Sequence, residues 1–193
     1  VLERIKMKWV LNAGDGAFDA PKLDFILTDA IGRECQCGTI QVDMNMPTRL
    51  EMSYIGEDGQ RHIPHMIHRA ILGSVERFIG VLIEHYAGKF PLWLAPVQVV
   101  VATITGDTED YAHKVKDALI KIGIRTELDI RNEKVGYKVR EHSSKKVPVI
   151  FVLGKKESSE NSVAIRRLGS QGNKTMSMKD AIAVIKNEAT PPI

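Results

Sequence analysis

Residues 67–78 read IHRAILGSVERF and decide the fold, because the spacing of the apolar residues changes within them. Residues 66–72 alternate and predict a strand with His68 on one face. After this strand the apolar residues recur at helical spacing, so we expect a helix. Ser74 is the expected N-cap of that helix and Gly88 its expected stop. The phrase therefore predicts a strand that leads directly into an amphipathic helix.

Arg77 falls in the first turn of this expected helix. The positive end of the helix dipole lies there, so a cation gains no stability from that position. A bound anion would explain the arginine, because the N-terminus of a helix is itself an anion site. The alternative is an ordinary surface arginine. We interpret Arg77 as a phosphate ligand.

Length and composition are those of a globular protein of one or two domains, with 193 residues and 44% hydrophobic residues. No apolar run approaches the roughly 20 residues that a membrane span needs, and no export signal is visible in residues 1–9. The two cysteines, Cys35 and Cys37, are too close in sequence for an ordinary structural disulfide. We therefore expect a reducing, cytoplasmic location.

Positive charge is concentrated in the second half of the chain. Residues 1–94 carry 10 Lys and Arg against 12 Asp and Glu, a net charge of −2. Residues 95–193 carry 17 against 12, a net charge of +5. Such an excess can be a solvated surface only, but it also suits a nucleic-acid partner.

The first half is rich in strand patterns. Residues 23–27 and 49–54 alternate between apolar and polar, and residues 57–60 read EDGQ, which predicts a hairpin turn. Strands joined by tight turns predict an antiparallel sheet. Residues 89–95 hold a proline and precede another, so we place a short linker there.

The second half alternates strand and helix. Expected strands lie at 97–103, 124–130, 147–153 and 163–167, and expected helices at 108–122, 134–145 and 177–188. This alternation predicts a mixed, largely parallel sheet flanked by helices. The whole chain is therefore expected to be α/β, with an antiparallel sheet in its first half.

Residues 67–78 resemble motif 3 of the class II aminoacyl-tRNA synthetases, in the form typical of the threonyl-tRNA synthetases. Residues 14–18 and 36–43 resemble active-site strands of the same family. Residues 93–98 and 131–138 resemble its anticodon module, which prolyl-, histidyl- and glycyl-tRNA synthetases share in looser form.

The resemblance covers nearly the whole chain and implies its domains. Residues 1–88 would be the closing portion of a class II catalytic domain that includes motif 3. Residues 89–95 would be the linker, and residues 96–193 the anticodon-binding domain.

In this family the arginine at the position of Arg77 binds the ATP phosphate tail. The resemblance also assigns Gln36 and Ser74 to the adenylate region, and Gln41 to the threonine and adenylate moieties. Arg77 and Gln41 would thus be catalytic. Activation of an amino acid needs its carboxylate held in line with the α-phosphate of ATP, so positioning and charge neutralisation suffice and no covalent nucleophile is required.

The resemblance gives His68 a metal role. The family holds one catalytic zinc per intact subunit with a cysteine and two histidines, and His68 matches the second histidine. From the residues alone, a lone histidine on an apolar strand face is more often part of the core. Zinc that binds the amino and hydroxyl groups of threonine would reject valine. The i, i+2 spacing of Cys35 and Cys37 does not favour a second metal site.

Gln36 and Gln41 are five residues apart, so on an unbroken strand they would point to opposite faces. The resemblance nevertheless implies that both contact ligands, so we expect a bulge or backbone break at Gly38, between them, that brings both side chains to one face. The alternative is that one glutamine acts through its backbone only.

In the second half the resemblance implies a set of tRNA-facing residues: Asn132, Lys134, Arg140, Glu157 and Arg166. Cations and amides can anchor phosphates, while Glu, Asn and Arg can bind the edges of unstacked anticodon bases. Lys145 and Lys146 would add attraction without specificity. The alternative for Glu141 and Lys145 is a solvated i, i+4 pair, which we favour.

Two departures from the family pattern stand out. The chain has Asp19 and Ala20, giving GAFDAPK, where most members have Tyr and Gly. Motifs 1 and 2 and the other two zinc ligands are not found in these 193 residues.

The expected function is threonine–tRNA ligase, the ATP-dependent charging of tRNA with threonine, with Mg²⁺ accompanying ATP. We expect the intact enzyme to be a cytoplasmic homodimer with no membrane or DNA partner, and this portion alone to be inactive. The alternative is a non-catalytic, synthetase-like RNA-binding or regulatory module.

Overall fold

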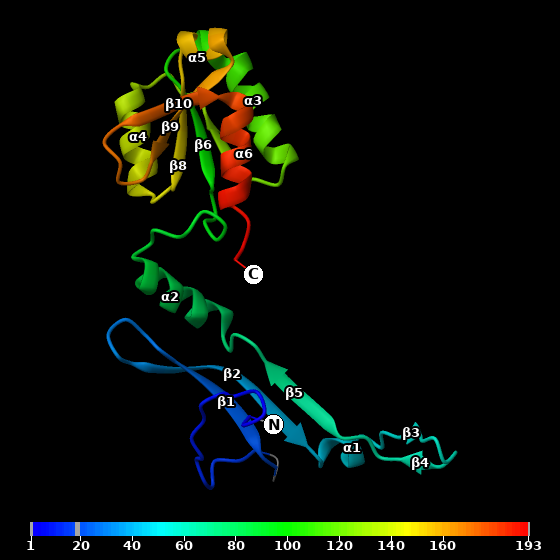
Figure 1. Ribbon diagram of the computed structural model, residues 1–193. Coiled ribbons are helices and arrows are strands. Elements are labelled where there is room, and N and C mark those ends of the chain that lie inside the picture. The colour runs from blue at the N-terminus through cyan, green and yellow to red at the C-terminus, as the bar shows by residue number, and fades with distance from the viewer. Residues whose placement is uncertain (1, 18–19, 193) are drawn as a thin grey trace. The chain divides into compact units, whose positions relative to one another are not determined.

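The computed structural model describes residues 2–17 and 20–192 and divides into two compact units, Val1–His85 and Tyr86–Ile193 (Figure 1). The elements of the first unit, in chain order, are β1 (Lys22–Thr28), β2 (Glu34–Asp43), α1 (Met46–Arg49), β3 (Tyr54–Ile55), β4 (Arg61–His62), β5 (Met66–Ala70) and α2 (Val75–Tyr86).

The first unit is built on a three-stranded antiparallel sheet in the order β1-β2-β5. The chain leaves β5 and enters α2 as the change of period predicts. Ser74 caps the helix, since its Oγ lies 3.3 Å from the backbone nitrogen of Arg77 and accepts that N–H. Gly88 follows the helix with a φ of +72°, a conformation that glycine adopts without strain.

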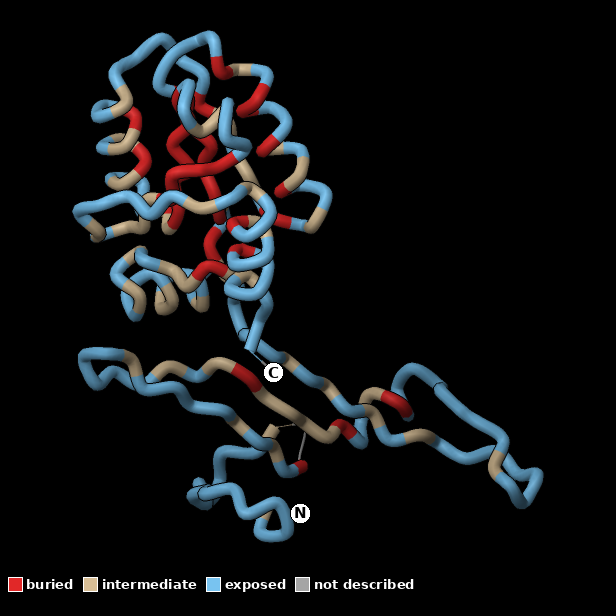
Figure 2. The backbone as a smooth tube through the Cα atoms, turned by 45° about the horizontal axis from the view of Figure 1, so that its top comes forward, coloured by how far each residue is buried: buried red, intermediate tan, exposed pale blue. Residues whose placement is uncertain are grey.

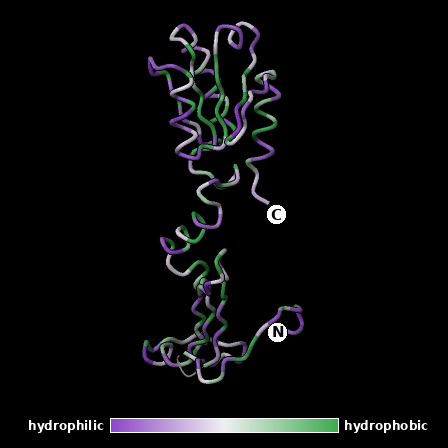
Figure 3. The backbone as a smooth tube through the Cα atoms, turned by 90° about the vertical axis from the view of Figure 1, so that its left-hand side faces the viewer, coloured by the Kyte–Doolittle hydropathy of each residue, from purple (hydrophilic) through white to green (hydrophobic). Residues whose placement is uncertain are grey.

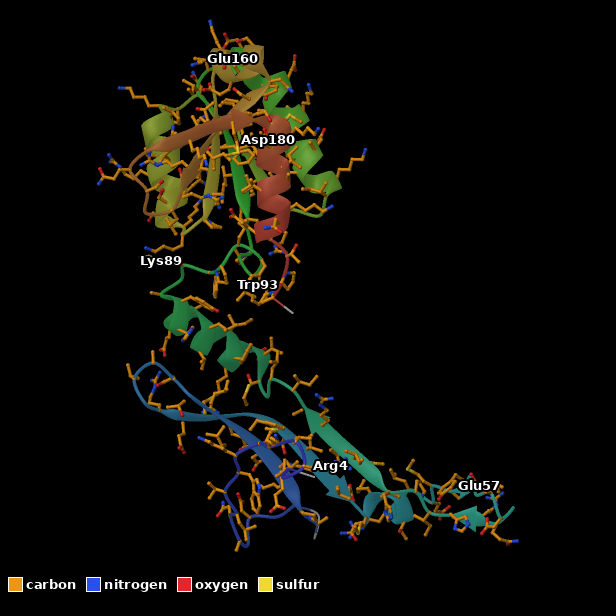
Figure 4. All side chains as sticks on the ribbon, viewed as in Figure 1. Arg4, Glu57, Lys89, Trp93, Glu160 and Asp180 are labelled. Carbon is orange, nitrogen blue, oxygen red and sulfur yellow. The ribbon has the colours of Figure 1, made fainter. Side chains whose placement is uncertain are left out.

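The strand expected at 49–54 is wrong over most of its length, because α1 ends at Arg49 and only Tyr54 joins a strand. Asp43 starts the local helix instead: its Oδ1 accepts the N–H groups of Asn45 and Met46 at 2.9 Å. Proline in the first turn supports that start. The hairpin turn at 57–60 is confirmed, since β3 and β4 pair as antiparallel strands, and Figure 4 labels Glu57 in this hairpin.

The elements of the second unit are β6 (Val99–Thr103), the 3₁₀ turn η1 (Gly106–Thr108), α3 (Glu109–Lys121), β7 (Thr126–Asp129), α4 (Val135–Ser144), β8 (Val149–Leu153), α5 (Lys155–Glu160), β9 (Ser162–Arg167), β10 (Asn173–Ser177) and α6 (Met178–Glu188). They form a five-stranded sheet in the order β10-β9-β8-β6-β7. The mixed sheet is confirmed. Its parallel share is smaller than expected, because β6 pairs in parallel with β7 and β8 while β9 and β10 are antiparallel.

Helices cover both faces of this sheet and create two apolar cores. On one face α3 and α6 pack against Val101, Phe151 and Val163. On the other face α4 packs against Val100 and Ile150 through apolar residues of its own. Buried positions are concentrated in these central strands (Figure 2), which are also the most hydrophobic part of the unit (Figure 3). Strands buried on both faces read as continuous apolar runs, as β6 and β8 do.

The segment expected to be a linker is anchored to the second unit. Gln98 is buried, donates to the carbonyl of Leu92 at 2.8 Å and accepts the N–H of Arg125 at 2.9 Å. The guanidinium of Arg125 donates to the carbonyls of Trp93 and Ala95. These bonds order residues 92–95 without any regular secondary structure.

Besides the short 3₁₀ turn η1, one helix and one strand of the second unit have no counterpart in the expected pattern. The helix α5, KKESSE, has no apolar residue to set a period, and β10, NKTMS, is a polar edge strand. Within the described residues, no helix combines the length and the apolar character needed to cross a membrane.

Candidate functional site

A β-bulge in β2 sets the geometry of the first unit. Phe25 pairs with Gly38, but the next residue of β1, Ile26, pairs with Gln36, so Cys37 is the extra residue of the bulge. The predicted break beside Gly38 is confirmed. A Cβ at Gly38 would lie 2.8 Å from the carbonyl oxygen of Ile71, so the close approach of the chain after β5 requires glycine here.

The bulge brings the two glutamines to one face of the sheet. Gln41 lies opposite Lys22 in β1 and opposite His68 in β5. Gln36 donates from its Nε2 to Oδ1 of Asp24 at 2.9 Å, and Asp24 is two residues from Lys22 and therefore on the same face. Both glutamine side chains can therefore face the same ligand, and the alternative that one of them acts only through its backbone is not needed. We call this surface the polar face; its members are Lys22, Asp24, Gln36, Thr39, Gln41, Asp43 and His68.

Three of the expected adenylate residues meet at one cavity of about 60 Å³: Gln36, Ser74 and Arg77. The other lining residues, from the β1–β2 hairpin, the turn after β5 and α2, are Leu27, Cys35, Cys37, Leu72, Phe78 and Val81. Both cysteines are free thiols.

Arg77 is exposed at the first turn of α2. Among the described residues its guanidinium has neither a hydrogen-bond nor an ion-pair partner. The neighbouring Glu76 already occupies the helix start, since it accepts the hydroxyl of Ser74 at 2.9 Å and supplies the negative charge that the dipole favours. An unpartnered cation at this place is suited to a phosphate.

His68 is paired with a buried carboxylate that the sequence did not reveal as functional. Its Nε2 lies 2.8 Å from Oδ2 of Asp43, whose side chain is fully buried. The N–H of Met46, more than any other partner, holds the pKa of Asp43 below its usual range. Asp43 lies at the end of the 36–43 stretch, 25 residues from His68, so only the pairing of β2 with β5 brings them together.

This pair fits a single zinc ligand. Metal-binding imidazoles commonly use their second nitrogen to bind a carboxylate, which fixes the ring. Residues 2–17 and 20–192 contain no group of three or more His, Cys, Asp or Glu that could hold a metal ion by themselves. The described residues of the first unit could therefore contribute one ligand with its orienting partner, and they contain no complete site.

The first departure from the family pattern falls partly outside the described residues, where Asp19 lies. Ala20 is buried and exchanges backbone hydrogen bonds with Ala17 at 3.0 and 3.2 Å. Lys22, to which the sequence assigned no role, binds the carboxylates of Asp24 and Asp15 at 3.0 and 3.3 Å. It adds a cation to the polar face beside Gln41.

In the second unit a cavity of about 550 Å³ gathers two of the expected tRNA residues, Arg140 of α4 and Arg166 of β9. Its remaining lining residues are Ile104, Val135, Gly136, Val139, Ser143, Val152 and Asn173. The wall is thus mixed, with apolar residues beside two arginines and two neutral polar side chains. Such a surface can bind a flat base together with an anionic phosphate. Ser143 and Asn173 were missed because neither carries a sequence signal.

The other expected tRNA residues do not line this cavity. Asn132 and Lys134 are exposed in the loop before α4. Glu157 is half-buried and caps α5, because its Oε2 accepts the N–H of Gly154 at 2.9 Å. The solvated pair expected between Glu141 and Lys145 is confirmed at 3.0 Å.

Comparison with known proteins finds two family models. The tRNA synthetase class II core domain (G, H, P, S and T) matches residues 1–86, and an anticodon binding domain matches residues 98–188. The threonine–tRNA ligase of Paracoccus denitrificans is 60% identical over 191 residues, which are 99% of this chain and 30% of the relative. That of Parvibaculum lavamentivorans is 62% identical over 179 residues, 93% of this chain and 28% of the relative. The chain thus spans less than a third of the length of these relatives.

Solved structures agree. The RNA binding domain of threonyl-tRNA synthetase from Cryptosporidium parvum superposes with a TM-score of 0.87 at 35% identity, over 99% of this chain and 48% of that one. A putative threonyl-tRNA synthetase from Aeropyrum pernix gives a TM-score of 0.66 at 29% identity, over 98% and 48%.

Proposed function

The chain belongs to the threonyl-tRNA synthetase family, and from that premise we propose that it supplies part of the active site and the anticodon-binding domain of a threonine–tRNA ligase. The intact enzyme would use ATP, accompanied by Mg²⁺, to charge tRNA with threonine. The observation that carries the proposal is the cavity at which Gln36, Ser74 and Arg77 meet. Gln41 and His68 lie opposite each other in β2 and β5, on the polar face to which the side chain of Gln36 also belongs.

The proposed chemistry is in-line attack of the threonine carboxylate on the α-phosphate of ATP, with departure of pyrophosphate. The unpartnered guanidinium of Arg77 would neutralise the phosphate tail, and Gln36 and Gln41 would hold the adenylate by hydrogen bonds. The bulge and the cap of α2 fix the backbone that carries these groups before the reaction, which lowers the reorganisation that the reaction needs.

His68 would be one of three zinc ligands, with Asp43 fixing the orientation of its ring. Bound zinc would hold the amino and hydroxyl groups of the substrate and so reject valine. A single imidazole is a weak site. The purified chain should therefore carry much less than one zinc per molecule, and full occupancy by elemental analysis would contradict this ligand assignment.

The second unit would bind the anticodon stem of threonine tRNA. The two arginines at its cavity and the exposed Asn132 and Lys134 of the loop before α4 support this part of the proposal. A homodimeric, cytoplasmic enzyme also belongs to the proposal, as an expectation from the family.

ATP–pyrophosphate exchange tests the proposal in a full-length enzyme that carries this sequence. Arg77→Ala should lower kcat/KM for ATP by about 10²–10³, the usual loss when one electrostatic contact to a reacting group is removed. Arg69→Ala is the matched control. Arg69 is exposed on β5 and follows His68 directly, so its side chain lies on the face of the strand opposite the polar face. Unchanged exchange in Arg77→Ala would refute the assignment.

The 193-residue chain alone should show no threonine-dependent exchange above a His68→Ala control. If instead the full-length enzyme binds tRNA but lacks exchange altogether, the chain is a non-catalytic RNA-binding module. The same assay therefore separates the two functions.

A further inference from the structure

Lys138 is a lysine in the middle of α4 whose side chain is only 1% exposed. Its Nζ donates to the carbonyl oxygen of Thr103 at 2.9 Å and to that of Asp129 at 3.1 Å. Thr103 is the last residue of β6 and Asp129 the last residue of β7. One ammonium group therefore joins the ends of two neighbouring parallel strands to the helix that covers them.

A second contact lies one helical turn further on. Nε2 of His142 is 2.8 Å from Oδ2 of Asp129, and both side chains are almost fully buried. Arg131 of the loop before α4 donates to the same carboxylate at 2.7 and 2.9 Å and to Glu141 of α4 at 3.0 Å. The helix and its preceding loop are thus held at one buried carboxylate.

Packing alone does not require this polar network. Val135 and Val139 already pack α4 against the sheet, and burial of an ammonium group is costly. Apolar contacts allow small shifts of a helix, whereas hydrogen bonds to fixed carbonyl groups allow one arrangement. The network therefore fixes the rotation and the translation of α4 on the sheet.

We propose that Lys138 and His142 are positioning residues for RNA recognition. They fix α4 and the loop before it, and so hold Asn132, Lys134 and Arg140 in the arrangement that recognises the anticodon. This inference rests on the proposed function of the second unit.

Because Lys138 is buried, its role can be distinguished from a phosphate contact by the salt dependence of RNA binding. A lysine that contacts phosphate contributes to the salt dependence of binding. A buried lysine releases no counterion from RNA, so its removal should leave the salt dependence unchanged. Loss of discrimination between RNAs without loss of salt dependence therefore identifies a positioning role.

The test uses the full chain and titrates a threonine-type anticodon stem-loop and an anticodon-swapped stem-loop at two salt concentrations. Lys138→Met keeps the volume of the stem and removes the charge; Lys121→Met, at the exposed end of α3, is the matched control. We expect Lys138→Met to weaken cognate binding about tenfold, a size typical of changes that act on a site they do not touch. Binding of the swapped RNA should change less than about twofold, since flexible Lys and Arg side chains can still reach phosphates after a small shift of α4, whereas contacts to base edges need a fixed geometry. Wild-type cognate affinity, or an equal loss for both RNAs, would overturn the proposal.

Amide hydrogen exchange supplies a readout that needs no RNA and separates this inference from the proposed function. In Lys138→Met, exchange should accelerate in residues 130–144 and stay unchanged in β8. His142→Leu should behave alike, whereas His142→Gln, which can still donate to Asp129, should retain cognate binding. If the wild-type chain fails to discriminate the two RNAs, the proposed function fails while hydrogen exchange still decides the positioning role. Unchanged or uniformly faster exchange would contradict it.

Discussion

Gly38→Ala should destabilise the β1-β2-β5 sheet by a predictable amount. The new Cβ would lie 2.8 Å from the carbonyl oxygen of Ile71, 3.1 Å from that of Ala70 and 3.3 Å from Cδ2 of Phe25. The first contact is closer than Cβ atoms tolerate, and its partner is backbone that cannot rotate away. Overpacking of this kind typically costs about 1–3 kcal/mol.

Hydrogen exchange measures this cost locally. A loss of about 1–3 kcal/mol corresponds to roughly 5- to 150-fold faster exchange of the amides that pair β2 with β5. Exchange in β8 of the second unit is the internal reference and should not change.

Gly80→Ala is the matched control, since no atom lies within 4 Å of a Cβ placed at Gly80 in α2. Alanine in a helix interior is more stable than glycine by about 0.5–1 kcal/mol, so exchange in α2 should slow. Wild-type exchange rates in the sheet of Gly38→Ala would refute the argument that the bulge requires a glycine.

Three further results are expected. Arg131, more than any other partner, holds the pKa of Asp129 below its usual range, so Asp129 stabilises the second unit above roughly pH 4 and loses that contribution as the pH falls through its folded pKa. Urea midpoints measured from pH 7 to 3 should therefore depend less on pH in Asp129→Asn than in the wild type. An equal dependence of the midpoint on pH in both proteins would contradict the assignment. Leu119→Ala, at a fully buried position of α3, should lower the free energy of unfolding by about 2–5 kcal/mol. Ile120→Ala, at the half-exposed neighbouring position, should lower it by less than about 1 kcal/mol. Equal urea midpoints for the two variants would contradict the described core. Arg166→Ala should weaken cognate stem-loop binding by about 1–3 kcal/mol relative to swapped RNA, and an equal loss for both would leave Arg166 as a phosphate anchor only.

The sequence by itself determined the elements whose residues carry a period. The change of spacing at Gly73 located the end of β5 and the start of α2, and the apolar runs at 97–103 and 147–153 located the central strands. These patterns can be recognised in the sequence because each depends only on residues a few positions apart along the chain. Polar segments without a period, such as the helix at 155–160, were missed. Residues 49–54 were misread as a strand from their alternation of apolar and polar residues, because a proline and the side chain of Asp43 favour a helical turn there.

The candidate sites depended on tertiary structure to a greater degree. The bulge could be predicted because the resemblance assigns Gln36 and Gln41 to one site, whereas a spacing of five residues would place them on opposite faces of a regular strand. The pairing of His68 with Asp43 and the cavity shared by Arg140 and Arg166 arise from strands and helices that are distant in sequence. No local sequence pattern encodes such contacts, because the free energy that forms them comes from burying whole helices and strands against each other. Which side chains come into contact is decided only by the packed fold.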